Sequence, residues 1–432
     1  MTGPGGESHR IVVVGGGAGG LELAIGLGRR LGRSRRAEVV LIDGSLTHLW
    51  KPLLHEVAAG TLDSRADAID YLALAATHGF RFRLGWMESL DRARKVVHLA
   101  PARDESGLEI APAQEVAYDT LVIAVGSTAN DFGVPGVGSH CLLLDSADQA
   151  DHFHKVFLAQ HLHALAGVPA EDAGRLTIAI VGAGATGVEL AAELHAANRL
   201  LTAYGHERDA PERELEIVLV EAAGRVLPGL PERIAEATET RLRQLGIRVV
   251  TDEQVSEVTA EGLRSKGGRF IPARLTVWAA GVKGPEVLER TDGLETNRLG
   301  QLVVGPTLQT SRDEAVFAIG DCAACPWPGH ERGVPPRAQA ASQQAAFLAR
   351  ALAGRLDGRS LPRFVYRDRG SLVSLSGYTA LGSIMGNLLG DVTFEGWLAR
   401  IAYRSLYRQH QRMAYGNLRT ALIMLSDWFR RG

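Results

Sequence analysis

Two stretches of the sequence share one pattern: Ile11-Val-Val-Val-Gly-Gly-Gly-Ala-Gly-Gly-Leu-Glu-Leu-Ala24 and Ile178-Ala-Ile-Val-Gly-Ala-Gly-Ala-Thr-Gly-Val-Glu-Leu-Ala191. Each begins with an apolar run typical of a buried strand, continues with G-x-G-x-x-G, and ends in apolar residues at helical spacing. The motif glycines are Gly15, Gly17 and Gly20 in the first copy and Gly182, Gly184 and Gly187 in the second. In order, they permit a tight turn, a close approach of backbone to a pyrophosphate, and close packing of helix on strand. The repeat therefore predicts two Rossmann-like dinucleotide-binding domains.

A second strand that ends in an acid follows each motif. The first strand ends in Asp43 and the second in Glu221. An acid at this position accepts hydrogen bonds from ribose hydroxyls. Glu221 would repel a 2′-phosphate, so the second domain is expected to prefer NADH to NADPH, although the nearby Arg225 favours the phosphate. The polar stretch 198–213 is expected to be a surface insertion.

Three further apolar runs complete the two domains. Residues 118–126 and 275–281 end in glycine, and residues 315–321 end in Gly-Asp. Residues 80–99 and 249–271 are typical of short strands in small antiparallel sheets. The predicted fold class is α/β, with two Rossmann-like domains. The second is inserted into the first, which resumes near Leu302.

Bulk composition narrows the class of protein further. A formal net charge of −2 argues against a nucleic-acid binder. The three cysteines, Cys141, Cys322 and Cys325, are too few for a disulfide scaffold and favour a reducing compartment. The N-terminus lacks a signal-peptide pattern, and no run of 18 apolar residues predicts a membrane-spanning helix.

The combined pattern resembles the two-dinucleotide flavoprotein reductases. Among them it is most similar to the type II NADH dehydrogenases, single-chain NADH:quinone reductases that do not pump protons. The most specific segment is Thr47-His-Leu-Trp-Lys-Pro-Leu-Leu-His-Glu-Val-Ala-Ala-Gly60. Residues 279–285, 317–323 and 336–344 also match the family, so the resemblance covers nearly the whole chain.

The resemblance implies FAD in the first domain and NADH in the second, with no metal. The implied FAD residues are Gly15, Gly17, Gly20, Asp43, Lys51, Pro52, Gly126, Asp321 and Ala338. The implied NADH residues are Gly182, Gly184, Gly187, Glu221, Ala280 and Gly281, with Glu189 close by. The expected parts are residues 1–145 (FAD domain), 146–285 (NADH domain), 286–390 (FAD domain resumed, with a quinone-site helix) and 391–432 (membrane association). Taken alone, Asp321 could be only a turn or N-cap residue.

A quinone site is indicated by the segment Ala338-Gln-Ala-Ala-Ser-Gln343. Gln339 and Gln343 are four residues apart and so share a helix face. Alanines between them would let a flat ring approach, and an amide can donate a hydrogen bond to a quinone carbonyl. The alternative is a surface glutamine pair on an alanine-rich helix.

Charged residues complete the expected catalytic set. Glu189 is expected near the nicotinamide, where a glutamate shapes the two substrate sites in the family, and Glu22 has the equivalent place in the first motif. Both could instead be first-turn acids favoured by the helix dipole. Arg369 is a candidate for a positive group near the flavin. The cofactor carries the redox chemistry, so no protein nucleophile is needed.

The C-terminal tail is basic and amphipathic. Arg400, Arg404, Arg408 and Arg412 repeat every four residues, and residues 396–432 carry seven arginines and one acid. Such a helix with interleaved aromatic residues is typical of one lying on an anionic membrane surface. The expected location is peripheral, on the cytoplasmic face of the inner (plasma) membrane, with ubiquinone or menaquinone as partner. A solvated helix or a homodimer interface is the alternative.

The sequence leaves rival functions, several of which depend on cysteines. A sulfide:quinone oxidoreductase needs a redox cysteine pair, which Cys322 and Cys325 could supply, but this chain also retains the NADH motif. A disulfide reductase would need a C-x-x-x-x-C soon after the first motif, and residues 48–60 contain no cysteine. A zinc site would need a second cysteine pair. A redox-sensing NADH-binding flavoprotein that acts through partners is the remaining alternative.

Overall fold

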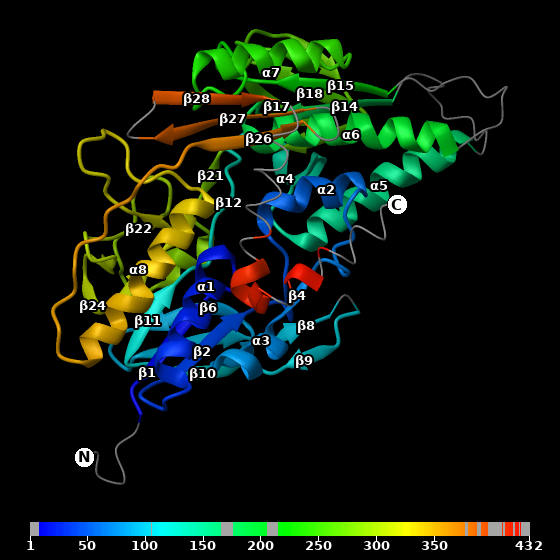
Figure 1. Ribbon diagram of the computed structural model, residues 1–432. Coiled ribbons are helices and arrows are strands. Elements are labelled where there is room, and N and C mark those ends of the chain that lie inside the picture. Colours follow the sequence, from blue (N-terminus) through cyan, green and yellow to red (C-terminus); the bar gives the residue numbers. More distant parts are fainter. Residues whose placement is uncertain are drawn as a thin grey trace.

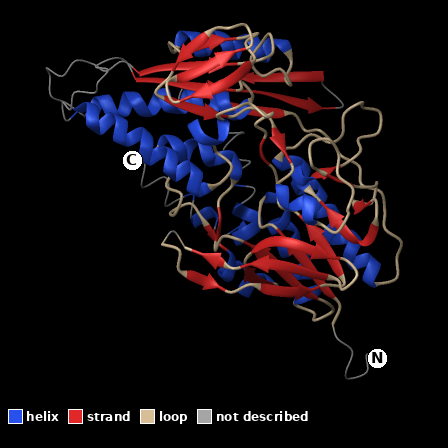
Figure 2. Ribbon diagram, turned by 180° about the vertical axis from the view of Figure 1, so that it is seen from behind, coloured by secondary structure: helices blue, strands red, loops and turns tan. Residues whose placement is uncertain are grey.

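The computed structural model describes residues 8–104, 106–165, 176–204, 215–375, 379–386, 390–395, 408, 411–417, 420–422 and 424. Two parallel sheets organise the chain, one in the lower and one in the upper part of Figure 1. The reverse view shows strands gathered in these two parts with helices between them (Figure 2).

The first sheet has six strands and contains the first glycine motif. Its order is β23 (Gln309–Thr310), β24 (Asp313–Ala318), β11 (Thr120–Ile123), β1 (Arg10–Val14), β2 (Glu38–Asp43) and β5 (Arg81–Leu84). All neighbouring pairs are parallel except β23 with β24. Residues 11–14 are at most 3% exposed, as expected for a parallel strand covered on both faces.

The second sheet has five parallel strands and contains the second motif. Its order is β13 (Cys141–Leu142), β20 (Leu275–Trp278), β14 (Leu176–Val181), β15 (Leu215–Val220) and β16 (Arg248–Val250). In sequence it lies between β11 and β24 of the first sheet, as predicted for an inserted domain. One face packs on α5 (Ala147–Leu165), α6 (Ala185–Tyr204) and α7 (Glu232–Gln244), and the other on a small antiparallel sheet.

Two small antiparallel sheets occur where expected, but two strands were misassigned. The small sheets are β6 (Trp86–Asp91), β7 (Val96–Ala100) and β10 (Gln114–Ala117), and β17 (Val255–Thr259), β18 (Gly262–Ser265) and β19 (Phe270–Pro272). The expectation was wrong for β5 and β16, which join the parallel sheets. Each follows a crossover helix, α3 (Tyr71–His78) or α7, and such a connection returns the chain parallel to the preceding strand.

The helices of the first domain pack closely through small residues. A Cβ at Gly19 of α1 (Ala18–Leu27) would lie 3.1 Å from the Cβ of Ala341 in α8 (Ala338–Leu356). A Cβ at Gly26 would lie 3.0 Å from that of Ala349. Glycine on one helix and alanine on the other therefore bring α1 (blue) and α8 (yellow) together (Figure 1).

Helix α2 (Leu54–Ala59) joins the two domains. It follows the first motif in sequence, yet Leu54, Val57 and Ala58 are buried in the core of the second domain with Phe153 and Phe157 of α5. A two-stranded pair, β12 (Thr128–Ala129) with β21 (Val282–Lys283), also lies where the chain passes between the domains.

The remaining elements are short. They are β3 (Thr47–His48), β4 (Ile69–Asp70), β8 (Ala102–Arg103), β9 (Glu109–Ala111), β22 (Leu302–Val303), β25 (Ala323–Ala324), α4 (Val137–His140), the π-helix η1 (Gly28–Gly32), and the 3-10 helices η2 (Lys51–Leu53), η3 (Glu286–Arg290) and η4 (Gly320–Cys322).

The C-terminal part begins with a hairpin sheet of β26 (Ser371–Leu375), β27 (Thr379–Gly386) and β28 (Gly390–Glu395). Of the predicted arginine stripe, Arg408 and Arg412 are described and helical, whereas Arg400 and Arg404 lie outside the described residues. Residues 411–417 are helical, and Ala414 is buried against the first domain. In the part of the chain that the structure describes, no helix is long and apolar enough to cross a bilayer.

Candidate active site

The two glycine loops have the same backbone geometry. Gly15 has a φ of +98° and Gly182 a φ of +102°, a region that side chains with a Cβ rarely adopt. A Cβ on Gly15 would lie 2.3 Å from the Ala124 carbonyl oxygen, and one on Gly182 would lie 2.8 Å from that of Ala279. Each loop therefore turns tightly against the end of a neighbouring strand, as the sequence predicts.

The other motif glycines differ in their surroundings. A Cβ on Gly20 would lie 1.8 Å from the carbonyl oxygen of Gly15, and the equivalent distance from Gly187 to Gly182 is 1.9 Å. In contrast, a Cβ on Gly17 or Gly184 would meet nothing within 4 Å. The third glycines are thus needed for helix packing. The second glycines face open space, which fits the approach of a pyrophosphate to a helix N-terminus.

The two predicted ribose acids also hold their glycine loops. Asp43 accepts hydrogen bonds from the backbone N–H groups of Gly16 (2.6 Å) and Ser45 (2.9 Å). Glu221 accepts the equivalent bonds from Ala183 (2.7 Å) and Ala223 (2.8 Å). Burial raises the pKa of Asp43, and the two N–H groups oppose that rise. Each acid therefore fixes the middle of its loop and retains lone pairs for sugar hydroxyls.

Arg225, the basic residue near the second glycine loop, is hydrogen-bonded to backbone carbonyl groups. One terminal nitrogen of its guanidinium donates to the carbonyl oxygens of Pro228 (3.2 Å) and Leu230 (3.0 Å). The side chain is therefore held against the loop that follows it. Its other terminal nitrogen is buried and has no hydrogen-bond partner among the described residues, so these bonds position the guanidinium without neutralising its charge.

Several predicted flavin residues converge where the first sheet ends. The Lys51 ammonium donates to the Ser127 carbonyl oxygen (2.9 Å) and lies 3.3 Å from an Asp145 carboxylate oxygen. The Ser127 hydroxyl donates to Asp321 Oδ2 (3.0 Å). Burial raises the pKa of Asp321, and the Ser127 hydroxyl and Lys51 oppose that rise. Gly126, with a φ of +73°, has open space where its Cβ would be.

On the nucleotide side of the second domain, Ala280 and Gly281 border the second loop. The Ala280 Cα lies 2.8 Å from a Cβ built on Gly182. Gly281 has a φ of +65°, and a Cβ there would come within 2.5 Å of the Phe132 ring. Both predicted residues therefore lie where the second glycine loop meets the chain returning to the first domain. Pro52 lies in η2, directly after Lys51.

Glu189 is buried at the junction of the two domains and the C-terminal hairpin. Its Oε1 accepts a hydrogen bond from the Ser374 backbone N–H (3.0 Å), and its Oε2 lies 3.8 Å from His55 Nδ1. Burial, opposed by the Ser374 bond and reinforced by Glu56 and Glu193, raises the pKa of Glu189 to about 8. Burial lowers the pKa of His55 to about 4. Burial therefore favours the neutral form of both side chains.

A second buried carboxylate was missed in the sequence. Glu193, one helical turn after Glu189, accepts a 2.6 Å hydrogen bond from the Thr61 hydroxyl. His55 and Thr61 come from α2 and the turn after it, whereas the glutamates come from α6. The four-residue spacing that places Glu189 and Glu193 on one helix face is visible in the sequence. Their partners His55 and Thr61 are distant in sequence, so the contacts themselves are not.

The two predicted quinone-site glutamines bind one loop, residues 367–370. The Gln339 amide nitrogen donates to the Gly370 carbonyl oxygen (2.8 Å) and to Asp368 Oδ1 (3.2 Å), and its oxygen accepts the Arg369 N–H (3.2 Å). Gln343 donates to the Arg367 carbonyl oxygen (2.8 Å) and accepts its N–H (3.1 Å). The amides therefore share a helix face as predicted and fix the 367–370 loop over the start of α8.

Other side chains near the start of α8 contact α1 or face solvent. Ala340 and Ala341, between the glutamines, are buried, and Ala341 packs against Gly19 of α1 rather than facing a ring. Their small size serves helix packing. The Arg369 side chain is exposed. Ala338 begins α8, and the Ser342 hydroxyl donates to Glu22 Oε2 (2.5 Å), which ties α8 to α1.

The cysteines form no disulfide in the described chain. Cys141, Cys322 and Cys325 are all free thiols. Burial raises the pKa of Cys322 to about 12 and that of Cys325 to about 11. The Cys322 thiol donates to backbone oxygens of Ile123 (3.5 Å) and Ile319 (3.2 Å). Protonated, buried thiols are poor nucleophiles, so these residues are packed as core.

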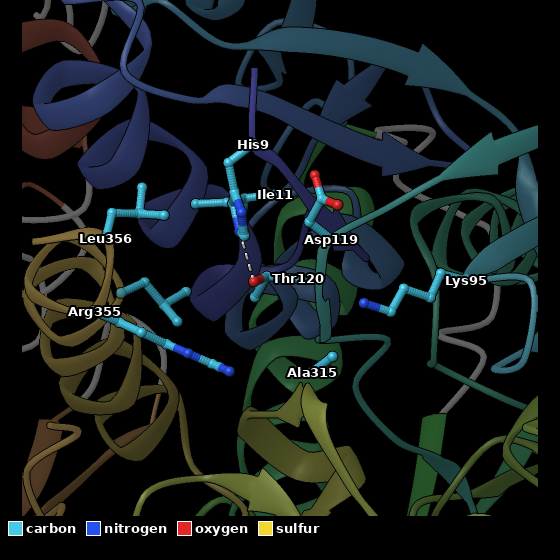
Figure 3. Close-up of a pocket in the computed structure, with 9 residues that line it drawn as sticks. His9, Ile11, Lys95, Asp119, Thr120, Ala315, Arg355 and Leu356 are labelled. Carbon is cyan, nitrogen blue, oxygen red and sulfur yellow. Dashed lines mark hydrogen bonds between the residues drawn. The ribbon is translucent and has the colours of Figure 1, made fainter. Parts of the chain in front are cut away.

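A cavity of about 390 Å³ lies at the amino ends of the strands of the first sheet, where β1 and β11 begin (Figure 3). The first glycine loop lies at the other, carboxyl, end of β1. Arg355 and Lys95 reach toward it from opposite sides, and His9 Nε2 lies 3.0 Å from the Thr120 hydroxyl. In open α/β sheets, ligands bind at the carboxyl ends of the strands. This cavity is therefore separate from the nucleotide sites.

Two open glycine cradles, each fixed by an acid at the carboxyl ends of a parallel sheet, define a flavoprotein reductase with two dinucleotide-binding domains. The family model for pyridine nucleotide-disulphide oxidoreductases matches residues 9–345. A type II NADH:quinone oxidoreductase of Haemophilus influenzae is 43% identical over 98% of this chain and 97% of its own. NdhA of Mycobacterium tuberculosis, named likewise, is 29% identical over 93% of this chain and 83% of its own.

Solved structures share the fold. NDH2 from Plasmodium falciparum in complex with NADH superposes with a TM-score of 0.77 at 18% identity, over 93% of this chain and 94% of that one. The sulfide:quinone oxidoreductase of Aquifex aeolicus gives 0.73 at 19% identity, over 95% and 92%. The chain belongs to the pyridine nucleotide-disulphide oxidoreductases and, within them, to the type II NADH:quinone oxidoreductases. The predicted family and two-domain α/β fold are thus confirmed.

Proposed function

We propose that the protein is an FAD-dependent NADH:quinone oxidoreductase that transfers two electrons to a membrane quinone without pumping protons. The observation that carries the proposal is the repeated cradle: Gly17 and Gly184 face open space, while Asp43 and Glu221 fix the loops around them. Relatives named type II NADH:quinone oxidoreductase along the whole chain support the choice of acceptor.

Residues of the first domain would hold FAD. The first glycine loop and Asp43 would bind the adenosine half, with Lys51, Pro52, Gly126 and Ala338 beside the flavin and Asp321 on the ribityl or pyrophosphate portion. Residues 1–145 and 286–390 make up this domain. When bound, FAD supplies the two-electron chemistry between NADH and quinone. Lys51, held by Ser127 and Asp145, would supply a fixed positive charge beside it.

Residues 146–285 would bind NADH. The second glycine loop receives the pyrophosphate, and Glu221 accepts hydrogen bonds from the ribose and disfavours a 2′-phosphate. Ala280 and Gly281 would lie at the nicotinamide end. Preference for NADH over NADPH follows from the acid at Glu221, which fixes the second glycine loop.

Quinone reduction requires protons as well as electrons, and Glu189 can hold one. Burial raises its pKa to about 8, which favours the protonated carboxyl group near neutral pH. Gln343 uses an N–H to bind Arg367, and a primary amide has a second N–H with which to bind a quinone carbonyl. Gln339 would position the 367–370 loop, and the exposed Arg369 would place a positive charge near the reduced centre.

The basic C-terminal tail would hold the enzyme on the cytoplasmic face of the inner membrane, beside its lipid-soluble substrate. Residues 391–432 form this region, and their charge favours an anionic surface. Either ubiquinone or menaquinone fits this arrangement, and the tail could also support a homodimer.

Anaerobic spectroscopy tests the proposal directly. The purified flavoprotein is first reduced with NADH and then mixed with a short-chain quinone. Bleaching of the flavin absorbance followed by rapid return of the oxidised spectrum is expected. Bleaching without reoxidation by any quinone would contradict the quinone site and favour a redox sensor that acts through partners.

A further inference from the structure

A dense cluster of arginines follows α1. Arg29, Arg30, Arg33, Arg35 and Arg36 fall within eight residues and form what we call the arginine cluster. All five side chains are exposed, and no acidic residue occurs between Leu23 and Ala37. Two arginines in the last turn of a helix can be explained by the helix dipole. The three that follow lie at or beyond the end of η1 and are not explained in this way.

Little of this charge is neutralised locally. Within the described ranges, Arg36 is the one member with an ion-pair partner, Asp357. The next acid along the chain, Glu38, is already paired with Arg10 (2.7 Å) and Arg81 (2.6 Å). Arg33 donates to a neutral acceptor, the Thr77 carbonyl oxygen. The cluster therefore presents a strong positive field to solvent.

The cluster also contacts the C-terminal tail. Arg29 donates to the Met413 carbonyl oxygen (3.0 Å) and, through Nε, to His78 Nδ1 (3.2 Å). Because His78 Nδ1 accepts that bond, its Nε2 carries the hydrogen and donates to the Ala414 carbonyl oxygen (2.7 Å). The tail segment 411–417 is thus fixed directly beside the arginine cluster. In Figure 1 the described tail helices (red) lie beside α1.

The tail segment adds charge to the same region, and the chain that follows it carries exposed apolar side chains. Arg412 is exposed, whereas Ala414, two residues later, is 1% exposed and packed on the first domain. Further along the tail, Leu422 and Met424 are 57% and 50% exposed. Basic side chains beside exposed apolar ones are the combination that binds a bilayer surface, where headgroups take the charges and acyl chains take the apolar groups.

We propose that the arginine cluster is a second membrane-docking element, which binds anionic phospholipid headgroups together with the C-terminal tail. The inference rests on the proposed quinone reductase function, since that function requires contact with a bilayer. The membrane contact would then be made by two segments nearly 400 residues apart in sequence, joined by Arg29 and His78. Guanidinium groups suit this role because they bind phosphate oxygens through paired N–H donors.

The test uses full-length FAD-loaded protein and vesicles of phosphatidylcholine with and without phosphatidylglycerol. The variant Arg30→Gln/Arg35→Gln removes two charges whose side chains make no contact in the proposed redox site. Binding to the anionic vesicles is expected to weaken about 30-fold, taking ~1 kcal/mol per arginine at an anionic surface and ~1.4 kcal/mol per tenfold. NADH oxidation with a water-soluble quinone is expected to stay unchanged, and binding of the wild type should fall steeply with added salt.

A control with the same loss of charge is Arg264→Gln/Arg269→Gln. Arg264 lies in β18 and Arg269 in the turn before β19, at the other end of the molecule (Figure 1). The control should bind anionic vesicles like the wild type. Equal vesicle binding by the Arg30/Arg35 variant and the wild type would overturn the inference. If that variant also changed its oligomeric state, the cluster would be assigned to an interface between copies of the chain instead. Failure of quinone to reoxidise the wild-type flavin would instead refute the proposed function, so the two failures are distinguishable.

Discussion

Replacing Gly184 by alanine separates the binding role of the second glycine loop from its structural role. A Cβ at this position meets nothing within 4 Å, so the folded protein should accept it with a stability change within about 0.5 kcal/mol. The same Cβ occupies the space that the NADH pyrophosphate would enter. Loss of one charge-assisted hydrogen bond from the loop costs about 1.5–3 kcal/mol, which corresponds to roughly a 10- to 150-fold increase in the KM for NADH.

The assay is steady-state NADH oxidation with a short-chain quinone, alongside thermal unfolding of the loaded enzyme. The matched variant is Gly187→Ala, whose Cβ would lie 1.9 Å from the Gly182 carbonyl oxygen. This variant should unfold at a clearly lower temperature, because overpacking costs about 1–3 kcal/mol. An unchanged KM for NADH in Gly184→Ala would refute the reasoning that this open space receives the dinucleotide.

Three further predictions concern the redox centre. With a pKa near 8, against 4.5 for an ordinary glutamate, Glu189 keeps its proton in the folded state while the unfolded chain loses it, so folding stability should fall between about pH 4.5 and 8. Glu189→Gln should flatten this decline in urea-unfolding midpoints, and an equally steep decline in the variant would assign the effect to other groups. Gln343→Ala should raise the KM for quinone at least several-fold while stopped-flow reduction of the flavin by NADH stays unchanged; slower flavin reduction would place the residue in the NADH half-reaction instead. Cys322→Ala should retain turnover, with about 1 kcal/mol lost from a small core cavity, and loss of activity without unfolding would revive a thiol mechanism.

The glycine loops were predictable because local geometry dictates them. Gly15 and Gly182 need a positive φ, and Gly20 and Gly187 leave no room for a Cβ, so few other sequences can form these turns. The acids at the ends of β2 and β15 follow from the same local unit. Short strands such as β5 and β16 carry no such requirement, and their place in a parallel sheet depends on the preceding crossover.

The surroundings of Glu189 were not predictable in the same way. Its partners His55 and Ser374 lie far from it in sequence on either side, and they meet it only because α2 and β26 both pack on α6. Likewise, the resemblance pointed to Gln339 and Gln343, but not to their common hydrogen bonding with residues 367–370. Such contacts arise from tertiary packing. The spacing of apolar residues along one sequence predicts helices and strands but not which of them come into contact.

The burial of α2 in the core of the NADH domain limits how the two domains can move. Swinging them apart would expose Leu54 and Val57, which are 4% and 2% exposed. At about 1.5–3 kcal/mol for each such side chain, an open form would cost roughly 3–6 kcal/mol and would be populated at about 1% or less. Lys51 and Pro52, which we propose to lie beside the flavin, belong to the 3-10 helix η2 that runs directly into α2. The two domains should therefore keep a fixed donor–acceptor geometry through the catalytic cycle, without an opening and closing motion between them.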